Sequence, residues 1–388
     1  MPAATLSQAE PAPASFPANY FLGNFTRRAD KSPPITTVAS FPANYFLENL
    51  AMRADNSALV TAMNQKELWY VPPAAATEPV TPILLHTFEQ LTFSLNEVEP
   101  DVFYLITSNV YTDHKSSLHR IDLRKWSPGK TIRPQKVLDF STEVRFLNGS
   151  CLIGSRTILV ADSVGVIWRV DLPQDGSTPV ARVWLRHESM RNYPGQMKPE
   201  QPGINGVRYA ATLRYLYYTA TAKKLVMRVK IDPESLDALG EPEHVSVGRM
   251  ADDFCIDESA GVAYLTTHRE NSIDCVSLNP ARNSYRFIVA GDPVNEELIG
   301  PSSAAWSRRP GEYGKVAFVT SDGGTASPLP DGVRRPAKLL RVELPEPPAA
   351  LRSQFSPEPR EEPVNAPLPI SRSWISTERS NPARGRLV

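Results

Sequence analysis

The stretch Ile35-Thr36-Thr37-Val38-Ala39-Ser40-Phe41 has the composition of a β-strand, yet no partner strand lies near it in the sequence. Four of its seven residues are β-branched, which is typical of strands. At the other end of the repetitive region, the last unit stops at Leu344 one strand short. We therefore predict that Ile35–Phe41 supplies the missing fourth strand and closes a ring of sheets, which removes exposed sheet edges.

Short apolar strands recur between residues 35 and 344 in units of about 40–60 residues, the length of a four-stranded propeller blade. No segment shows convincing helical periodicity over a dozen residues. Six such units predict an all-β fold, a six-bladed β-propeller. The clearest strands are Val102–Thr107, Thr157–Ala161, Tyr215–Thr219, Val262–Thr267 and Lys315–Thr320.

The two ends differ from this region. We expect residues 1–34 to be a disordered or duplicated segment, residues 35–344 the propeller, and residues 345–388 a disordered Pro-rich tail. The stretch Ser15–Leu22 is repeated as Ser40–Leu47. The second copy continues into a strand pattern, so we interpret the first as a tandem duplication or gene-model artefact, or alternatively as an extra strand or plug.

Composition excludes several classes of protein. The 42 basic and 42 acidic residues give no net charge, which argues against nucleic-acid binding. No apolar run approaches the roughly 18 residues that span a bilayer. Three cysteines without a CxxC pair fit a reducing compartment, and no secretory signal is recognisable, so we expect a cytoplasmic protein. The GxSxG, HExxH, GxGxxG and P-loop motifs are absent.

Polar residues stand where a propeller would bring them to one channel mouth. The innermost strand of each blade starts at that face, and the loop between the second and third strands opens on it. The strand starts carry Glu48-Asn49, Asn148-Gly149, Asn205-Gly206, Asp252-Asp253 and Ser302-Ser303, and the loops carry Asn109, Tyr111, His114, Asp162, Ser163, Thr219, Thr221, His268, Asn271 and Asp322. Glu, Asn and Asp side chains aimed at one axis would suit a hard divalent cation. The alternative is that Asn-Gly and Asp-Asp only form turns.

The order of these motifs resembles the SMP-30/gluconolactonase superfamily of six-bladed propellers, over about residues 35–344. The phrases that carry the resemblance are Phe41-Pro42-Ala43-Asn44, Glu48-Asn49-Leu50, Asn205-Gly206-Val207, Asp252–Asp257 and Gly300–Ala305. More narrowly, the chain is similar to the fungal hetero-Diels-Alderase-like branch, which occurs with secondary-metabolite pathways.

The resemblance implies a metal site, although the sequence around two of the ligand positions differs from that of the lactonases. In the lactonases of the superfamily a divalent cation, calcium or magnesium, would have the ligands Glu48, Asn148, Asn205 and Asp252, with Asp252 also the general base. Here Asn-Leu follows Glu48 where those lactonases have Gly-Pro, and Gly-Ser follows Asn148 where they have Asp-Gly. These changes put lactonase turnover in doubt.

The fungal branch implies a pericyclase. Such an enzyme joins an o-quinone methide, derived from a tropolone or phenol, to a humulene-type sesquiterpene and gives a meroterpenoid (tropolone sesquiterpenoid). The cycloaddition needs no cofactor and no nucleophile, because holding two apolar partners in a reactive pose supplies the rate. Asp252 or His268 would be the acid or donor. The substrate-binding residues would be Phe46, Phe93, Tyr111, Phe146, Tyr209, Phe254, Trp306 and Ser302.

Two alternatives stay open. One is a lactone hydrolase that uses the divalent cation to polarise a carbonyl group. The other is a propeller without catalytic activity that binds a protein partner through one face. Metal content separates the lactonase from the pericyclase, because only the lactonase requires the cation.

Overall fold

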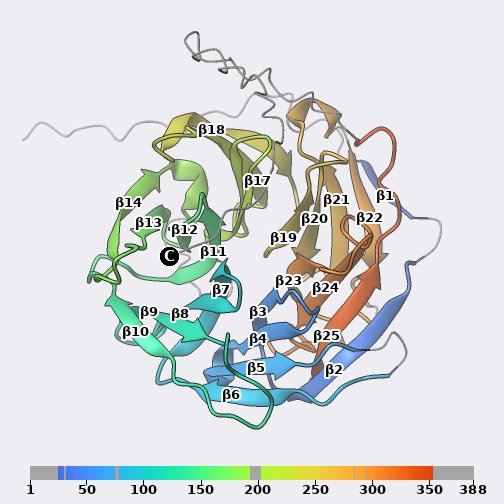
Figure 1. The fold of residues 1–388 in the computed structure, drawn as a ribbon. Helices are drawn as coiled ribbons and strands as arrows, with labels where there is room; N and C mark the ends of the chain where they lie inside the picture. The colour runs from blue at the N-terminus through green and yellow to red at the C-terminus, as the bar shows by residue number, and fades with distance from the viewer. Residues whose placement is uncertain are drawn as a thin grey trace, which may run out of the picture. The chain divides into compact units, whose positions relative to one another are not determined.

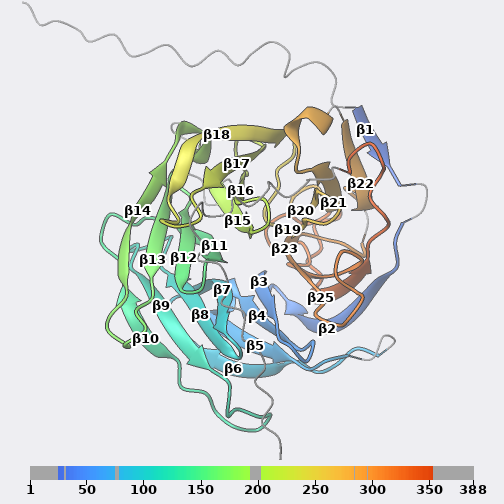
Figure 2. The same cartoon turned by 45° about the horizontal axis from the view of Figure 1, so that its top comes forward.

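The computed structural model of the chain describes residues 25–29, 32–74, 78–192, 202–283, 285–294 and 296–352. Figures 1 and 2 show their sheets arranged as blades around a central axis. Besides strands, these residues form three short 3-10 helices, η2 (Met63–Gln65), η3 (Glu188–Met190) and η4 (Pro280–Arg282), and no α-helix. Within the described ranges no helix is long and apolar enough to cross a membrane.

Six sheets make the ring, each with four antiparallel strands and one with an additional parallel strand, which confirms the predicted six-bladed β-propeller. Named from the axis outward, blade 1 contains β3 (Leu47–Met52), β4 (Ala58–Ala62), β5 (Glu67–Val71) and β6 (Ile83–Thr87). Blade 2 contains β7 (Leu91–Glu99), β8 (Val102–Ser108), β9 (Ser116–Asp122) and β10 (Gln135–Asp139). Blade 3 contains β11 (Leu147–Ile153), β12 (Thr157–Asp162), β13 (Val166–Asp171) and β14 (Val180–Arg186).

The second half of the ring repeats this order. Blade 4 contains β15 (Ile204–Ala210), β16 (Tyr215–Ala220), β17 (Leu225–Ile231) and β18 (Ala238–Val247). Blade 5 contains β19 (Phe254–Asp257), β20 (Val262–Thr267), β21 (Ser272–Ser277) and β22 (Tyr285–Gly291). Blade 6 contains β23 (Pro301–Trp306), β24 (Val316–Ser321), β25 (Pro336–Glu343) and β2 (Ile35–Ala43).

Blade 6 closes the ring as predicted from the unpaired N-terminal strand. Strand β2 pairs antiparallel with β25, with Ile35 opposite Val342 and Thr37 opposite Leu340. The side chains of Val38, Ala39 and Phe41 are buried against blades 1 and 6. Because one sheet contains strands from both ends of the ring, opening the ring requires breaking a complete strand pair.

The ordered structure extends beyond the predicted propeller at both ends. Phe25–Arg28 forms β1, which adds a fifth strand to blade 5 by parallel pairing with β22. After β25, Leu351 is fully buried in the core between blades 5 and 6, and Tyr264 donates a hydrogen bond to the Pro345 carbonyl. The repeated stretch Ser15–Leu22 and the tail beyond Arg352 lie outside the described residues.

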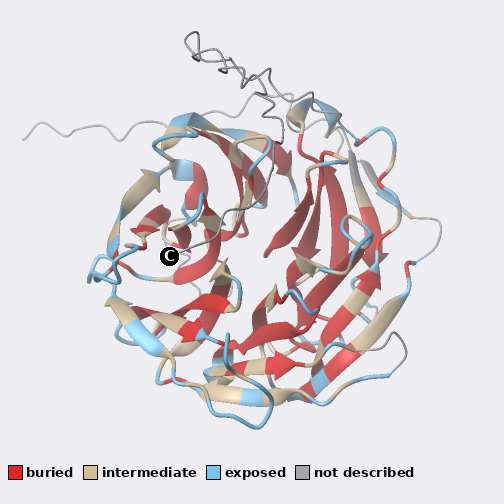
Figure 3. Cartoon of the chain, viewed as in Figure 1, coloured by how far each residue is buried: buried red, intermediate tan, exposed pale blue. Residues whose placement is uncertain are grey.

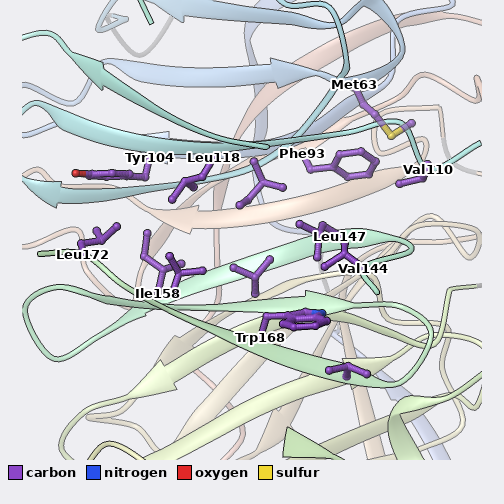
Figure 4. Close-up of a cluster of buried hydrophobic side chains, with 14 of the residues drawn as sticks. Met63, Phe93, Tyr104, Val110, Leu118, Val144, Leu147, Ile158, Trp168 and Leu172 are labelled. Atoms are coloured by element: carbon purple, nitrogen blue, oxygen red, sulfur yellow. The ribbon is translucent and has the colours of Figure 1, made fainter. Parts of the chain in front are cut away.

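The core lies between the blades. Figure 3 shows the strands nearest the axis almost entirely buried, and exposure concentrated on outer strands and loops. The faces of neighbouring sheets pack on one another through apolar clusters such as the one in Figure 4, where Phe93 and Tyr104 of blade 2 meet Ile158 and Trp168 of blade 3. Burying one large apolar side chain of this kind stabilises the folded state by roughly 1.5–3 kcal/mol. This packing holds the six inner strands in fixed positions around the axis.

Candidate functional site

One end of the axis carries a pocket built from the starts of the inner strands. Its volume is about 390 Å³, and Glu48, Asn148, Asn205 and Asp252 all line it. These four side chains come from blades 1, 3, 4 and 5, and each residue is at most 9% exposed. The four predicted ligand positions therefore converge, because each inner strand begins at the same face of the ring.

Glycines allow the inner strands to approach so closely. A Cβ atom on Gly149 would lie 2.4 Å from the Asn205 carbonyl oxygen, and one on Gly206 would lie 2.4 Å from Asp253 Oδ1. Both distances are far below a van der Waals contact. The Asn-Gly pairs are parts of β11 and β15, so they are not turns; glycine is required because strands from neighbouring blades touch at the axis.

The walls of the pocket are aromatic. Phe46, Phe93, Tyr111 and Phe146 line it as predicted, together with Met63 and Met250. The Phe93 and Phe146 rings lie 6.1 Å apart and edge to face, and Tyr111 contacts Phe146 at 6.3 Å in the same way. Tyr111 is half-exposed at the rim. An apolar body would therefore be held above a polar floor.

Four of the predicted substrate-binding residues do not line this pocket. Tyr209 and Trp306 line a separate cavity of about 300 Å³. Tyr209 follows Asn205 by four residues on β15, and since a strand rises about 3.3 Å per residue it lies near the opposite end of the axis. Phe254 is fully buried between blades 4 and 5. Ser302 is also buried, and its hydroxyl donates to the Leu47 carbonyl oxygen at 2.5 Å.

The floor holds two carboxylates that no lysine or arginine of the described residues pairs with. Burial raises the pKa of Glu48 well above its usual value, and repulsion from Asp252, Asp253 and Asp322 raises it further. Burial also raises the pKa of Asp252, to about 6, although nearby His268 opposes the shift. Asp252 Oδ1 accepts a 2.5 Å hydrogen bond from the Asn205 side-chain amide. The pocket floor therefore brings together acidic groups that repel one another.

His268 stands beside this floor and pairs with Asp322, a residue that the sequence placed at the same channel mouth without predicting the pair. Its Nε2 atom lies 3.2 Å from Oδ2 of Asp322, which is completely buried. Burial alone would lower the pKa of His268, but attraction to Asp322 and Asp252 raises it overall. Asp322 also accepts hydrogen bonds from the main-chain N–H groups of Gly324 and Ala326, both at 2.8 Å. His268 and Asp322 each lie in a loop between the second and third strands of a blade. This shared position was the signal in the sequence that could have suggested their pairing.

A second polar layer crosses the axis directly below the floor. Arg208 of blade 4 donates to Asp253 Oδ2, to the Phe254 carbonyl at 3.0 Å and to the Ser150 carbonyl at 3.4 Å. Ser303 of blade 6 and Asn49 of blade 1 also donate to Asp253 Oδ2, at 2.6 and 3.3 Å. We call Arg208, Asp253, Ser303 and Asn49 the axial lock, because together they join blades 1, 3, 4, 5 and 6.

The floor residues fit a divalent cation by their chemistry. Two carboxylates and two amides offer oxygen atoms, which hard cations prefer. Among the described residues, the side chains of Glu48 and Asn148 have no hydrogen-bond partner although both are buried, so their oxygen atoms are free for a ligand. Within the same ranges no three His, Cys, Asp or Glu side chains are grouped to hold a metal ion by themselves. A cation here would depend on the two amides.

Comparison with known proteins gives the fold. No family model matches the chain, and no curated protein matches it. A luciferin-regenerating enzyme superposes with a TM-score of 0.56 at 12% identity, covering 80% of this chain and 95% of that one. A calcium-binding protein, regucalcin, from Agrobacterium tumefaciens gives 0.53 at 13%, covering 82% and 96%. The gluconolactonase XC5397 from Xanthomonas campestris gives 0.53 at 13%, covering 82% and 97%.

These identities establish shared architecture alone. The narrower resemblance to the fungal hetero-Diels-Alderase-like branch stays a prediction. In its fold the chain is a six-bladed propeller of the type found in gluconolactonase, regucalcin and luciferin-regenerating enzyme.

Proposed function

We propose that the pocket is the active site of a cation-dependent lactone hydrolase that takes a lactone with an apolar body. The observation that carries this proposal is the floor, where two buried carboxylates without a basic partner stand beside two amides. The similar solved structures include a gluconolactonase and a calcium-binding protein, which supports the same chemistry. The aromatic walls distinguish the proposed substrate from a sugar lactone, because they offer few polar groups to hydroxyls.

Glu48, Asn148, Asn205 and Asp252 would hold the cation, which when bound would polarise the lactone carbonyl group. Asp252 serves as the general base: in the cation-free protein its pKa is raised to about 6, so it is already ionised at neutral pH, and a positioned carboxylate of this kind can accept a proton. It takes a proton from the water whose oxygen attacks the carbonyl carbon. The ring C–O bond then breaks, and the leaving alkoxide takes the proton back from Asp252, which gives a hydroxy acid and restores the carboxylate.

The surrounding residues fix this base. The Asp252 carbonyl accepts hydrogen bonds from the Gly206 main-chain N–H at 3.0 Å and from the Thr219 hydroxyl at 2.6 Å. Blade 4 therefore holds the main chain of Asp252, and Asn205 orients its carboxylate. The His268–Asp322 pair places a positive charge near the floor, where it would stabilise negative charge that develops on the substrate oxygen.

Hydrolysis of a fused aromatic lactone such as dihydrocoumarin, compared with glucono-δ-lactone, tests the proposal. We expect kcat/KM to be higher for the aromatic lactone, activity to be lost with a chelator, and calcium or magnesium to restore it. Asp252→Asn should lower kcat by about 10²–10⁴, the usual contribution of a general base. Glu143→Gln, at an exposed glutamate outside the pocket, is the matched control. Absence of hydrolysis of either lactone in the cation-loaded protein would exclude this function.

The aromatic walls also favour a second function, the hetero-Diels–Alder addition of an o-quinone methide to a humulene-type sesquiterpene. Phe46, Phe93 and Phe146 would hold both apolar partners, and protonated His268 would donate to the quinone-methide oxygen. Because this addition also proceeds without enzyme, the test compares rate and enantiomeric ratio with and without protein, from a hydroxymethyl-tropolone precursor. A racemic product at the uncatalysed rate would rule it out, whereas selectivity that persists in chelator would favour it over hydrolysis.

A further inference from the structure

The loop between β9 and β10 concentrates positive charge in a chain whose net charge is zero. From Arg120 to Lys136 the sequence has six basic residues and a single acidic one, Asp122. The loop follows the third strand of blade 2, and third strands end at the face opposite the inner-strand starts. This basic loop therefore lies at the other face of the ring from the pocket.

The basic side chains surround a hollow in the surface. It has a volume of about 740 Å³, and Arg124, Lys125, Lys130 and Arg133 line it with Asp122. Asp122 is already neutralised, because Arg120 approaches its carboxylate at 3.0 Å and Arg124 also pairs with it. The remaining three cations have no carboxylate partner among the described residues; Lys130 Nζ reaches only the Lys125 carbonyl, at 3.5 Å.

The loop is held in a defined shape. The Trp126 indole donates to the Lys130 carbonyl at 2.8 Å, and its ring packs on Tyr70 at 4.8 Å. Main-chain hydrogen bonds join Trp126 to Leu123 at 3.0 Å and Lys130 to Ser127 at 3.1 Å. A fixed scaffold reduces the entropy that a ligand must overcome when it orders the groups that bind it.

We propose that this hollow binds a ligand with clustered phosphate groups, either a polyphosphorylated lipid headgroup or its soluble counterpart. Three unpaired cations around one hollow match several closely spaced negative charges. Each phosphate group carries more charge than a carboxylate and offers several acceptor oxygens to arginine and lysine. Bound to a membrane in this way, the ring would leave its pocket on the face turned away from the bilayer. The proposal does not depend on the reaction in that pocket.

Vesicle flotation and competition test it with the full chain. The probes are phosphatidylcholine vesicles with phosphatidylinositol bisphosphate, vesicles with phosphatidylserine at the same total charge, and soluble inositol hexakisphosphate. We expect binding to the phosphoinositide vesicles and to the soluble compound, weakened by salt. Lys125→Ala/Lys130→Ala/Arg133→Ala should weaken it about a hundredfold, since each surface cation contributes about fivefold. The matched control, Lys115→Ala/Arg186→Ala/Arg334→Ala, removes three exposed cations from the pocket face, away from the proposed contact, and should stay within about twofold of wild type.

The vesicle and soluble probes distinguish a lipid headgroup from a soluble phosphate compound as the ligand. Binding to phosphoinositide vesicles without competition by the soluble compound assigns the site to a lipid, and equal affinity for both assigns it to the headgroup chemistry alone. Equal binding to phosphatidylserine vesicles would overturn the requirement for clustered phosphates. Retained affinity in the triple variant, or no binding of any probe, would overturn the site itself.

Discussion

Two consecutive carboxylates, Asp252 and Asp253, occupy layers of the axis with opposite electrostatics. Asp253 faces the axial lock, where its Oδ2 receives hydrogen bonds from Arg208, Ser303 and Asn49. Asp252 faces the pocket, where the Asn205 amide is the only side-chain hydrogen-bond partner of its carboxylate among the described residues, and a second carboxylate, Glu48, lies near. A buried charge with a cationic partner is explained by the fold, whereas one without such a partner has to be explained by function.

One oxygen atom of the axial lock lacks a hydrogen bond among the described residues. Oδ1 of Asp253 is buried close to Gly206 and has no hydrogen-bond partner within the part of the chain that the structure describes. Burial raises the pKa of Asp253, and Arg208 opposes that shift. Arg208 therefore favours the ionised form of the buried Asp253 carboxylate, and removing Arg208 would leave that charge without its cation. At the pocket floor no arginine or lysine of the described residues pairs with Asp252, and the rise in its pKa is opposed by His268 beside it and by the hydrogen bond from Asn205.

The largest expected effect comes from breaking the lock. Arg208→Met leaves Asp253 buried without its cation, and we expect the free energy of unfolding to fall by about 3–5 kcal/mol. Urea unfolding followed by tryptophan fluorescence measures this. Arg208→Met/Asp253→Asn removes the unpaired charge as well and should recover much of the loss. If the single variant is as stable as wild type, or the double variant is no better than the single, the lock is not held by this charge pair.

Neutralising the pocket carboxylate should act in the opposite direction. The pKa of Asp252 rises from 3.8 to about 6 on folding, so the folded state holds this proton more tightly and stability falls as pH rises between those values. The shift corresponds to about 3 kcal/mol above pH 6. Asp252→Asn lacks this penalty, so at pH 7 it should be more stable than cation-free wild type, with the difference vanishing near pH 4.

The gain in stability of Asp252→Asn over cation-free wild type should increase as pH rises from 4 to 7. Urea unfolding at several pH values in the presence of chelator measures it, and Glu143→Gln, at an exposed glutamate outside the pocket, is the control. A constant difference between Asp252→Asn and wild type from pH 4 to pH 7 would contradict the assigned pKa shift. A less stable variant at pH 7 would show that Asp252 contributes to the fold as Asp253 does.

A cation should stabilise the floor and leave the lock unchanged. Calcium or magnesium at a hundred times its dissociation constant should raise the free energy of unfolding by about 2.7 kcal/mol, by mass action. Glu48→Gln should remove most of this gain because it withdraws one carboxylate ligand. Thermal unfolding at increasing cation concentration measures both. An equal gain in Glu48→Gln and wild type would place the cation elsewhere.

Much of the architecture follows from the sequence because strand patterns are local. Ile35–Phe41 and the incomplete last unit were enough to predict closure, which the pairing of β2 with β25 confirms. The residues at the starts of the inner strands were correctly predicted to face the pocket, since the topology of a propeller places all of these starts at one face of the ring. It failed for Tyr209 and Trp306, whose distance along the strand places them at the other end of the axis.

The axial lock could not be predicted in the same way. Arg208 contacts residues of three other blades, and each contact joins segments separated by 45 to 95 positions in the sequence. No local pattern marks such a residue, because a single arginine on a strand is commonly exposed. Asp322 illustrates the same limit: its loop position was recognised, but its pairing with His268 depends on how blades 5 and 6 pack.

The smallest expected effect concerns a single hydroxyl group of the lock. Ser303 donates a 2.6 Å hydrogen bond to Asp253 Oδ2, while Arg208 and Asn49 remain as donors when it is removed. Ser303→Ala should therefore lower the free energy of unfolding in urea by about 1.5 kcal/mol, the lower end of the range for hydrogen bonds to charged groups. Its cation affinity and its lactone kcat/KM should equal those of wild type, because Ser303 does not line the pocket. Asn205→Ala, which removes a pocket amide, is the matched comparison and should lose cation affinity. If Ser303→Ala weakens cation binding as much as Asn205→Ala does, then the floor and the lock act as one unit, and the separation between a functional and a structural layer is wrong.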